Sequence, residues 1–281
     1  MRIDAALAWA ISELEGTESP SVDAKVLLAN ALNQSQTYLF TWPDKQLTEQ
    51  QTEVFKRMVF RRGQGEPVAY ITGSRDFWTL TLATSPHTLI PRPDTEVLVE
   101  QVLSWISKRS DNAPSSLSLC DLGTGTGAIA LALASELPNS RVVGVDFLND
   151  AVELALCNAK SNGITNASFV QSDWFAGLSG QTFDVIVSNP PYIEIADPHL
   201  DKGDVRFEPK SALTSGVDGL DDIKRIISQA PAFLNEGGLI AFEHGFDQGD
   251  AVRALLAKAG FKAPYTVKDY GGNDRVTLAT M

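Results

Sequence analysis

The sequence predicts an α/β protein: a mostly parallel sheet, preceded by a small N-terminal helical bundle and ending in a hairpin. Three observations support this class. From Leu117 onward, short apolar runs alternate with amphipathic ones, which is typical of parallel strands joined by helices. Residues 1 to about 75 show only helical periodicity. The glycine-centred segment from Tyr265 to Ala279 has the pattern of two strands and a turn.

The first domain is predicted to span residues 1–75 as a helical bundle. Apolar residues recur at the i, i+3, i+4 spacing of helices in Ile3–Leu14, Val22–Leu32 and Leu47–Arg62. Ser21 and Asp44 are the side chains expected to cap the second and third of these helices.

Residues 76–93 are predicted to form a β-hairpin and a connector. The β-branched and aromatic run Asp76–Leu82 is expected to be one arm of the hairpin. The Pro-rich segment Leu89–Glu96 follows it, and its prolines make it a stiff link to the next domain.

Residues 94–281 are predicted to form the α/β domain, which opens with a helix that Asp94 or Thr95 caps and that continues to about Lys108. Strands are expected at Leu117–Leu122, Arg141–Phe147, Ser168–Gln171, Phe183–Ser188 and Leu239–Glu243. Helices are expected at Gly127–Leu137, Asp150–Asn162, Ile223–Leu234 and Gln248–Ala259. The closing hairpin, Tyr265–Asp269 and Arg275–Ala279, would insert one antiparallel strand into the sheet.

Composition is that of an ordinary globular protein. The chain has 281 residues, of which 43% are hydrophobic and 21% charged, and no apolar run is long enough to span a membrane. Its start lacks a signal-peptide pattern, and its histidines and cysteines show no metal-ligand spacing. Cys120 and Cys157 are both expected to be buried thiols. We therefore predict a cytoplasmic protein with no metal and no membrane contact.

Charge argues against a nucleic-acid partner. The net charge is −12, and residues 86–281 alone carry 15 basic and 25 acidic residues. Such a field repels the phosphate backbone, which dominates nucleic-acid affinity. One local exception is the cluster Lys56, Arg57, Arg61 and Arg62. We interpret it as a solvated helix face, with contact to an acidic partner or RNA as the alternative.

A glycine-rich loop, Gly123-Thr124-Gly125-Thr126-Gly127, follows the first strand of the α/β domain and opens a helix. Glycines there permit a tight turn and a close approach of the backbone to a ligand. Asp146 ends the next strand, where a carboxylate accepts hydrogen bonds from ribose hydroxyls. These two features fit a nicotinamide cofactor and S-adenosylmethionine equally well.

Two details favour S-adenosylmethionine as the cofactor. The loop has the spacing Gly-x-Gly-x-Gly, whereas dinucleotide-binding loops have Gly-x-Gly-x-x-Gly. Asp121, just before the loop, would repel a pyrophosphate but suits the ammonium of an amino-acid moiety. After the third strand, Asp173 is placed to contact the adenine amine and Trp174 to stack on the ring, with a core aromatic as the alternative for Trp174.

The tetrapeptide Asn189-Pro190-Pro191-Tyr192 ends the apolar run Phe183–Ser188. Its prolines have a fixed φ and no N–H, so their carbonyls are rigid acceptors. Asn189 adds a side-chain acceptor, and Tyr192 adds a flat wall. This set fits a planar group that bears an –NH2, such as a carboxamide or the exocyclic amine of a base. A turn that merely ends a strand is the alternative.

Together these motifs resemble the amino-methyltransferases with an Asn-Pro-Pro-Tyr motif, which are Rossmann-like class I methyltransferases with a seven-stranded sheet. More narrowly, the chain resembles the release-factor glutamine methyltransferases, the PrmC/HemK family, over essentially its whole length. The most specific segments are Gly65–Gly73 and Leu89–Glu96, with further support from Asp204–Pro209. The Asn-Pro-Pro-Tyr motif itself is shared with DNA adenine methyltransferases.

The resemblance implies methyl transfer from S-adenosylmethionine to the Gln side-chain amide nitrogen in the Gly-Gly-Gln motif of bacterial class I peptide release factors. It implies that the loop Gly123–Gly127 holds the methionine moiety, Asp146 the ribose and Trp174 the adenine. It also implies that Asn189 and the Pro190 carbonyl hold the substrate amide and that Tyr192 packs on it. Pro191 belongs to the same substrate-binding segment, and Asn189 is expected to contact the cofactor as well. The N-terminal bundle would dock the release factor, and we expect a monomer.

Three other functions stay open: a DNA adenine N6-methyltransferase, a nicotinamide oxidoreductase, and a binding module that retains a cofactor fold. The acidic charge and the lack of a basic recognition domain oppose the first. Glu66, Arg92 and Glu96 are interpreted as locking the hairpin to the catalytic domain, with lining of the site as the alternative. Arg206 and Glu208 are interpreted in the same way, as a salt-bridged loop near the substrate, and His244 as structural with a role as a base as the alternative.

Overall fold

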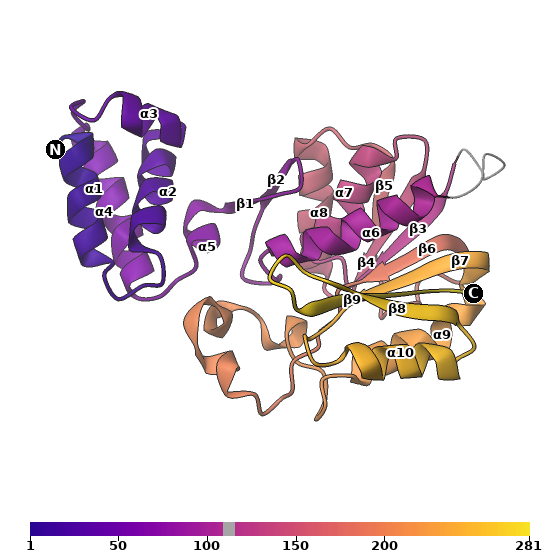
Figure 1. The fold of residues 1–281 in the computed structure, drawn as a ribbon. Coiled ribbons are helices and arrows are strands. Elements are labelled where there is room, and N and C mark those ends of the chain that lie inside the picture. Colours follow the sequence, from indigo (N-terminus) through magenta and orange to yellow (C-terminus); the bar gives the residue numbers. More distant parts are fainter. Residues whose placement is uncertain (109–115) are drawn as a thin grey trace. The chain divides into compact units, whose positions relative to one another are not determined.

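The computed structural model describes residues 1–108 and 116–281, which form two compact units (Figure 1). The helical unit comprises Met1–Ser74 together with His199–Phe207. The sheet unit comprises Arg75–Pro198 and Glu208–Met281. A short stretch from the middle of the chain therefore belongs to the N-terminal helices, which the sequence analysis did not anticipate.

The helical unit contains five α-helices around an apolar core, and its residues 199–207 form short 3₁₀ turns. The α-helices are α1 (Ile3–Glu13), α2 (Pro20–Leu32), α3 (Gln36–Thr41), α4 (Glu49–Gly63) and α5 (Val68–Thr72). The core holds the fully buried side chains of Leu27, Leu28 and Phe55. Three of the helices were expected, and the short α3 and α5 were missed because one or two turns show too little periodicity.

The predicted caps of α2 and α4 are wrong. Helix α2 begins at Pro20, so Ser21 lies inside it; proline suits the first helical position because its missing N–H needs no partner. Helix α4 is capped by Thr48 and not by Asp44. The Thr48 hydroxyl accepts from the Gln51 N–H, and the Gln51 side chain accepts from the Thr48 N–H, a reciprocal arrangement that satisfies two helix-end donors.

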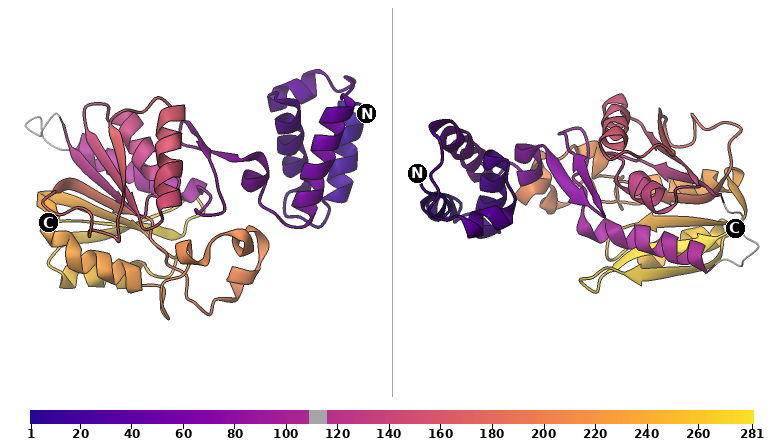
Figure 2. Two further views of the ribbon diagram at one scale, coloured as in Figure 1. Left: turned by 180° about the vertical axis from the view of Figure 1, so that it is seen from behind. Right: turned by 90° about the horizontal axis from the view of Figure 1, so that it is seen from above.

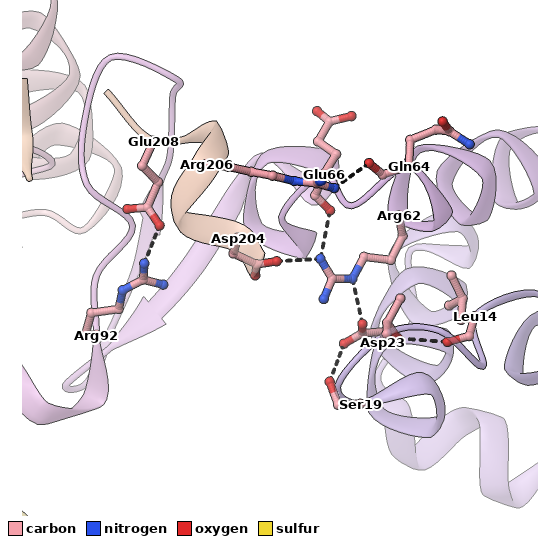
Figure 3. A network of polar contacts seen from close by, with 11 residues as sticks. Leu14, Ser19, Asp23, Arg62, Gln64, Glu66, Arg92, Asp204, Arg206 and Glu208 are labelled. Atoms are coloured by element: carbon pink, nitrogen blue, oxygen red, sulfur yellow. Dashed lines mark hydrogen bonds and ion pairs between the residues drawn. The ribbon is translucent and has the colours of Figure 1, made fainter. Parts of the chain in front are cut away.

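Residues 199–207 are held in the helical unit by an ion pair between Asp204, which is partly exposed, and the buried Arg62 (Figure 3). The Arg62 guanidinium donates to Asp23 at 2.7 Å, to Asp204 at 2.6 Å and to the Glu66 carbonyl at 3.1 Å. Arg62 is only 6% exposed. The interpretation of the basic cluster as a solvated face is therefore wrong for Arg62, which is buried among carboxylates that pair with it.

The sheet unit is built on a seven-stranded sheet in the order β5-β4-β3-β6-β7-β9-β8 (Figures 1 and 2). The strands are β3 (Ser118–Leu122), β4 (Arg141–Asp146), β5 (Ala167–Gln171), β6 (Phe183–Ser188), β7 (Leu234–Glu243), β8 (Lys262–Lys268) and β9 (Asp274–Thr280). Strand β9 is antiparallel to both of its neighbours, and the other neighbouring pairs are parallel. This confirms the predicted sheet and its inserted antiparallel strand.

Helices cover both faces of this sheet (Figure 1). On one face lie α6 (Glu96–Ser107), α7 (Ala128–Glu136) and α8 (Asn149–Ser161), and on the other lie α9 (Asp221–Gln229) and α10 (Gly249–Lys258). Helix α9 is shorter than predicted. Its last turn gives way to the 3₁₀ segment Ala230–Ala232, because Pro231 has no N–H to continue the helix.

Two smaller predictions are wrong. The run Asp76–Leu82 is not one arm of a hairpin but crosses both arms, β1 (Ser74–Phe77) and β2 (Leu80–Ala83). The turn comes at Trp78, whose φ of 57° lies in the left-handed region. Cys120 is buried as expected, whereas Cys157 is exposed because it lies on the outer face of α8.

Candidate functional site

The candidate site lies where the carboxyl ends of the parallel strands meet. Strand order reverses between β3 and β6, and ligands of open α/β sheets bind at such a switch point. A cavity of about 350 Å³ lies there, lined by residues from the loops that follow these strands. Nine residues predicted for the site line it: Gly123, Thr124, Gly125, Thr126, Asp146, Asp173, Trp174, Asn189 and Pro191.

Hydrogen bonds to the end of β4 hold the glycine loop. The N–H groups of Gly123 and Thr124 both donate to the Val145 carbonyl at 2.9 Å. The Gly125 N–H donates to Asp146 Oδ2, also at 2.9 Å. The loop and the predicted ribose-binding carboxylate are thus one hydrogen-bonded unit.

Asp146 presents a carboxylate to the cavity that is fixed by the backbone. Its Oδ1 accepts from the Leu148 N–H at 3.0 Å. Burial raises its pKa, while the N–H groups of Leu148, Gly125 and Phe147 oppose that rise. A carboxylate held this way keeps lone pairs for further donors, as recognition of a ribose requires.

Asp121 lies beneath the glycine loop and is not among the residues that line the cavity. Its Oδ2 accepts from the Thr124 hydroxyl at 2.6 Å and from the Ala130 N–H at 3.2 Å. Within residues 1–108 and 116–281, its buried Oδ1 has no hydrogen-bond partner. Burial raises the pKa of Asp121 to about 7. Its contact with a ligand ammonium stays a prediction, and the unpartnered oxygen is the observation that fits it.

Gly127 is also absent from the cavity wall, and its surroundings give it a packing role. A Cβ at this position would lie 3.1 Å from both the Ala155 Cβ and a Leu131 methyl carbon. The absence of a side chain therefore lets the start of α7 approach α8.

Asp173 and Trp174, two neighbours in the loop after β5, also line the cavity. Both oxygens of Asp173 accept from the Arg225 guanidinium at 2.8 Å, and Arg225 lines the cavity too. A Cβ on Gly123 would lie 3.4 Å from the Trp174 ring, so this ring borders the glycine loop. Adenine contacts by Asp173 and Trp174 stay predictions.

Of the Asn-Pro-Pro-Tyr motif, Asn189 and Pro191 line the cavity, whereas Pro190 and Tyr192 do not. Asn189 Nδ2 donates to the Thr95 hydroxyl oxygen at 3.3 Å. The Tyr192 hydroxyl donates to Glu243 Oε1 at 3.3 Å. Burial, followed by the Glu243 charge, raises the pKa of Tyr192 well above its usual range, so Tyr192 stays protonated.

The backbone after the motif is fixed from three sides. The N–H groups of Tyr192 and Ile193 donate to the Leu213 carbonyl at 3.2 and 2.8 Å. The Tyr192 carbonyl accepts from Gln248 Nε2 at 3.0 Å. Gly219 approaches the same carbonyl so closely that a Cβ would lie 2.1 Å from its oxygen. These contacts set the direction of the whole tetrapeptide.

Sequence reasoning missed several residues that line the cavity, among them Thr88, Thr95 and Arg225. The sequence predicts for Thr95 only a capping role, yet its side chain makes no capping bond to α6. Arg92, interpreted mainly as structural, lines the cavity and pairs with the buried Glu208 (Figure 3). Thr95 and Arg92 could have been suspected because they lie in the Pro-rich connector, whereas no sequence pattern distinguishes Arg225 from other exposed arginines.

Other polar residues have structural contacts. Glu66 pairs with Arg61, and Arg206 donates to the Gln64 carbonyl at 2.9 Å, both within the helical unit. Glu96 accepts from the Trp78 N–H at 2.9 Å. The His244 ring is buried between the Gly245 carbonyl and the Thr277 hydroxyl.

Neither a metal centre nor a membrane helix is found in the part of the chain that the structure describes. No described helix is long and apolar enough to cross a membrane. No group of three or more His, Cys, Asp or Glu side chains within residues 1–108 and 116–281 is arranged to hold a metal ion.

The sheet order and the cavity at its switch point define a class I methyltransferase. Two solved structures share the fold. A methyltransferase from Pyrococcus furiosus has a TM-score of 0.52 and 20% identity, covering 72% of this chain and 88% of that one. The Thermus thermophilus 16S rRNA N2 G1207 methyltransferase has a TM-score of 0.55 and 21% identity, covering 74% of this chain and 49% of that one. At these identities the likeness shows the fold alone.

Sequence comparisons give the particular family. Residues 5–73 match the model of the PrmC N-terminal domain, and residues 114–260 match that of a methyltransferase domain. The release factor glutamine methyltransferase of Vibrio cholerae is 53% identical, over 98% of this chain and 96% of its own length. That of Escherichia coli is 49% identical, over 97% and 96%. The chain therefore belongs to the release factor glutamine methyltransferase family and is an S-adenosylmethionine-dependent protein methyltransferase.

Proposed function

We propose that this protein methylates the side-chain amide nitrogen, N5, of the Gln in the Gly-Gly-Gln motif of bacterial class I peptide chain release factors. This modification would modulate translation termination. The observation that carries the proposal is the Asn189 amide at the cavity wall, because its Nδ2 is committed to Thr95 and its Oδ1 is left to accept a substrate N–H. Near-full-length similarity to enzymes named for release factor glutamine methylation supports the same substrate.

S-Adenosylmethionine is the methyl donor of this proposal, and the residues present fit it. The cavity of about 350 Å³ is within the size range of small-molecule sites. Asp146 would accept from the ribose, the loop Gly123–Thr126 would hold the methionine moiety, and Trp174 would border the adenine. The buried, unpartnered Oδ1 of Asp121 would favour a cationic donor nearby. When bound, S-adenosylmethionine supplies the electrophilic methyl group.

The protein's own task is to make an amide nitrogen nucleophilic. That nitrogen is a weak nucleophile because its lone pair is delocalised into the adjacent carbonyl. Asn189 Oδ1, at the cavity wall, would accept a hydrogen bond from one of its N–H groups. The Pro190 carbonyl, which is not among the residues that line the cavity, stays the predicted acceptor for the other. Both bonds would favour electron density on the nitrogen as it becomes pyramidal. Both acceptors are rigid before the substrate binds, so little reorganisation opposes the reaction. The nitrogen becomes strongly acidic after attack, and its proton can leave to solvent.

The helical unit is proposed to dock the release factor. Its match to the PrmC N-terminal domain covers residues 5–73. Three of its large apolar side chains are exposed: Phe40 is 64%, Trp42 52% and Phe60 68% accessible. Exposed aromatic side chains are the kind that anchor protein interfaces. In this proposal a monomer binds one release factor.

The test is methyl transfer from labelled S-adenosylmethionine to a purified release factor. A copy of the factor in which the Gly-Gly-Gln glutamine is alanine controls for the target residue, and duplex DNA is offered as a competing acceptor. Label on the unaltered factor alone is the expected result. Label on DNA, or equal label on the alanine copy, would overturn the proposed acceptor, and binding of S-adenosylmethionine without any transfer would support a binding module instead.

A further inference from the structure

A buried carboxylate that the mechanism above does not use lies beside the Asn-Pro-Pro-Tyr motif. Glu243 is the last residue of β7 and is 2% exposed. In the parallel pairing of β6 with β7, Ser188 lies opposite Phe242. Asn189 and Glu243 are the next residues along each strand, so the sheet register brings them to the same level.

Glu243 is only half satisfied by direct hydrogen bonds. Its Oε1 accepts from the Tyr192 hydroxyl at 3.3 Å, and its buried Oε2 has no hydrogen-bond partner within residues 1–108 and 116–281. Burial raises the pKa of Glu243, whereas the Thr95 hydroxyl, the Arg275 charge and the Tyr192 hydroxyl all lower it. The Tyr192 hydroxyl donates to this carboxylate, and the Thr95 hydroxyl is near enough to lower its pKa. An ionised carboxylate can only accept from such hydroxyls.

Thr95 connects this carboxylate to Asn189. Its oxygen accepts from Asn189 Nδ2 at 3.3 Å, so its own proton is free to be donated elsewhere. Thr95 is 5% exposed and lines the cavity, which leaves water little access to compete for that proton. A proton turned towards Glu243, whose pKa the Thr95 hydroxyl lowers, would give the donors one direction, from Asn189 to Thr95 to Glu243.

We propose that Thr95 and Glu243 are positioning residues that fix the Asn189 amide with Nδ2 turned inward and Oδ1 turned to the substrate. The inference rests on the proposed function, because orientation matters only if Asn189 Oδ1 accepts from the substrate amide. If the Asn189 side-chain amide flipped, its NH2 group would face the substrate N–H. Both groups are donors, so the hydrogen bond to the substrate would be lost. Neither Thr95 nor Glu243 needs to touch the substrate for this effect.

The first test is Thr95→Val, which keeps the shape of the side chain and removes its hydroxyl. We expect kcat for release-factor methylation to fall about 10-fold, with KM and the affinity for S-adenosylmethionine nearly unchanged. Thr95→Ser, which restores the hydroxyl, should recover most of the lost kcat. In an Asn189→Ala background, Thr95→Val should have no further effect, because the residue through which it acts is gone.

The second test is Glu243→Gln. This substitution replaces one carboxylate oxygen by an NH2 group, which donates a hydrogen bond and so cannot accept one from the Thr95 or Tyr192 hydroxyl. We expect a similar fall in kcat. In the double variant with Thr95→Val, kcat should fall by less than the product of the two single-variant fold-changes. Glu136→Gln is the matched control, since Glu136 also accepts a hydrogen bond, from Trp78 Nε1 at 2.7 Å, but lies at the far end of α7.

The outcomes separate this inference from the proposed function. Full activity of Thr95→Val, or an equal loss with and without Asn189, would overturn the positioning role, because a merely structural residue would act independently of Asn189. Failure of the unaltered protein to methylate any release factor would overturn the proposed function and the inference with it.

Discussion

At the scale of single residues, the polar groups of the cavity are bonded to the protein itself. Asn189 is held by Thr95, Asp146 by two backbone N–H groups, and Asp173 by Arg225. Such groups do not have to abandon a hydration shell or choose a rotamer when a ligand binds. The conformational entropy of these side chains is lost when the chain folds and not when the ligand binds. Such preorganised groups are the ones that give strong electrostatic catalysis.

Asn189 gives the most direct prediction at this scale. Asn189→Ala removes the acceptor and the amide plane together, so we expect kcat/KM to fall ~10²-fold or more. Calorimetric binding of S-adenosylmethionine should be retained, because Asp146 and the glycine loop are untouched. Asn189→Asp keeps an oxygen but adds charge, and it should be less damaging than alanine only if acceptor geometry dominates. Near-normal turnover of Asn189→Ala would contradict the mechanism.

Asp121 predicts a pH dependence of stability. Its pKa in the folded protein, about 7, lies above the ordinary value of 3.8, so the native state holds a proton that the unfolded chain has released between these pH values. The contribution of Asp121 to the free energy of unfolding should therefore fall as pH rises from about 4 to about 7, by up to ~4 kcal/mol.

The variant Asp121→Asn cannot ionise, and it should gain stability relative to the parent as the pH is raised. Denaturant unfolding of both proteins at about pH 5 and about pH 8 measures the effect as a difference of differences. The same stability gap at the two pH values would show that Asp121 has no raised pKa.

Residues at the cavity wall could be predicted from the sequence more readily than the side chains that hydrogen-bond to them. Gly123, Asp146 and Asn189 could be predicted because each lies at the carboxyl end of a strand, and parallel strands bring these ends to one edge of the sheet. The pairs Asn189 with Thr95 and Tyr192 with Glu243 are 94 and 51 residues apart in the chain. Such pairs depend on the directions of side chains, and the hydrophobic periodicity of a sequence does not predict these directions.

At the scale of elements, strand and helix positions were predicted well where periodicity was long, and element ends were not. Strand β6 has the predicted bounds, Phe183–Ser188. Helix α4 begins one turn later than Asp44 would have placed it, because the Thr48 box satisfies two donors whereas a single carboxylate satisfies one. Competition among nearby caps decides such ends, and their order of strength depends on local geometry.

Gly219 approaches the Tyr192 carbonyl so closely that a side chain at this position should displace the motif. Its φ is +69° and its Cα faces the Tyr192 carbonyl, so Gly219→Ala should strain the backbone and displace the motif. Gly180→Ala is the control, because Gly180 has a φ of +76° and open space around it. We expect the control to cost ~1–2 kcal/mol of stability with activity retained. Gly219→Ala should cost more by denaturant unfolding and should also lose methyl transfer; equal behaviour of the two would contradict the close approach.

At the scale of the whole molecule, the two units divide the work of recognition in our proposal. Phe60→Ser on α4 should raise KM for the release factor about 10-fold, since burying a Phe in an interface is worth roughly 1.5–3 kcal/mol. The kcat, and methylation of a short Gly-Gly-Gln peptide, should not change. Leu156→Ser is the control, as Leu156 is 47% exposed on α8 of the sheet unit. A KM equal to that of the parent would remove Phe60 from the docking surface.

The ion pair between Arg62 and Asp204 in the helical unit has a consequence for how the protein is made. Arg62 leaves the ribosome 142 residues ahead of Asp204. At bacterial and eukaryotic elongation rates of roughly 5–20 residues per second, that gap lasts roughly 7–30 s. During this interval the guanidinium has Asp23 but lacks its second carboxylate. The N-terminal helices thus spend a fixed part of every synthesis cycle without the Asp204 carboxylate that completes this ion pair.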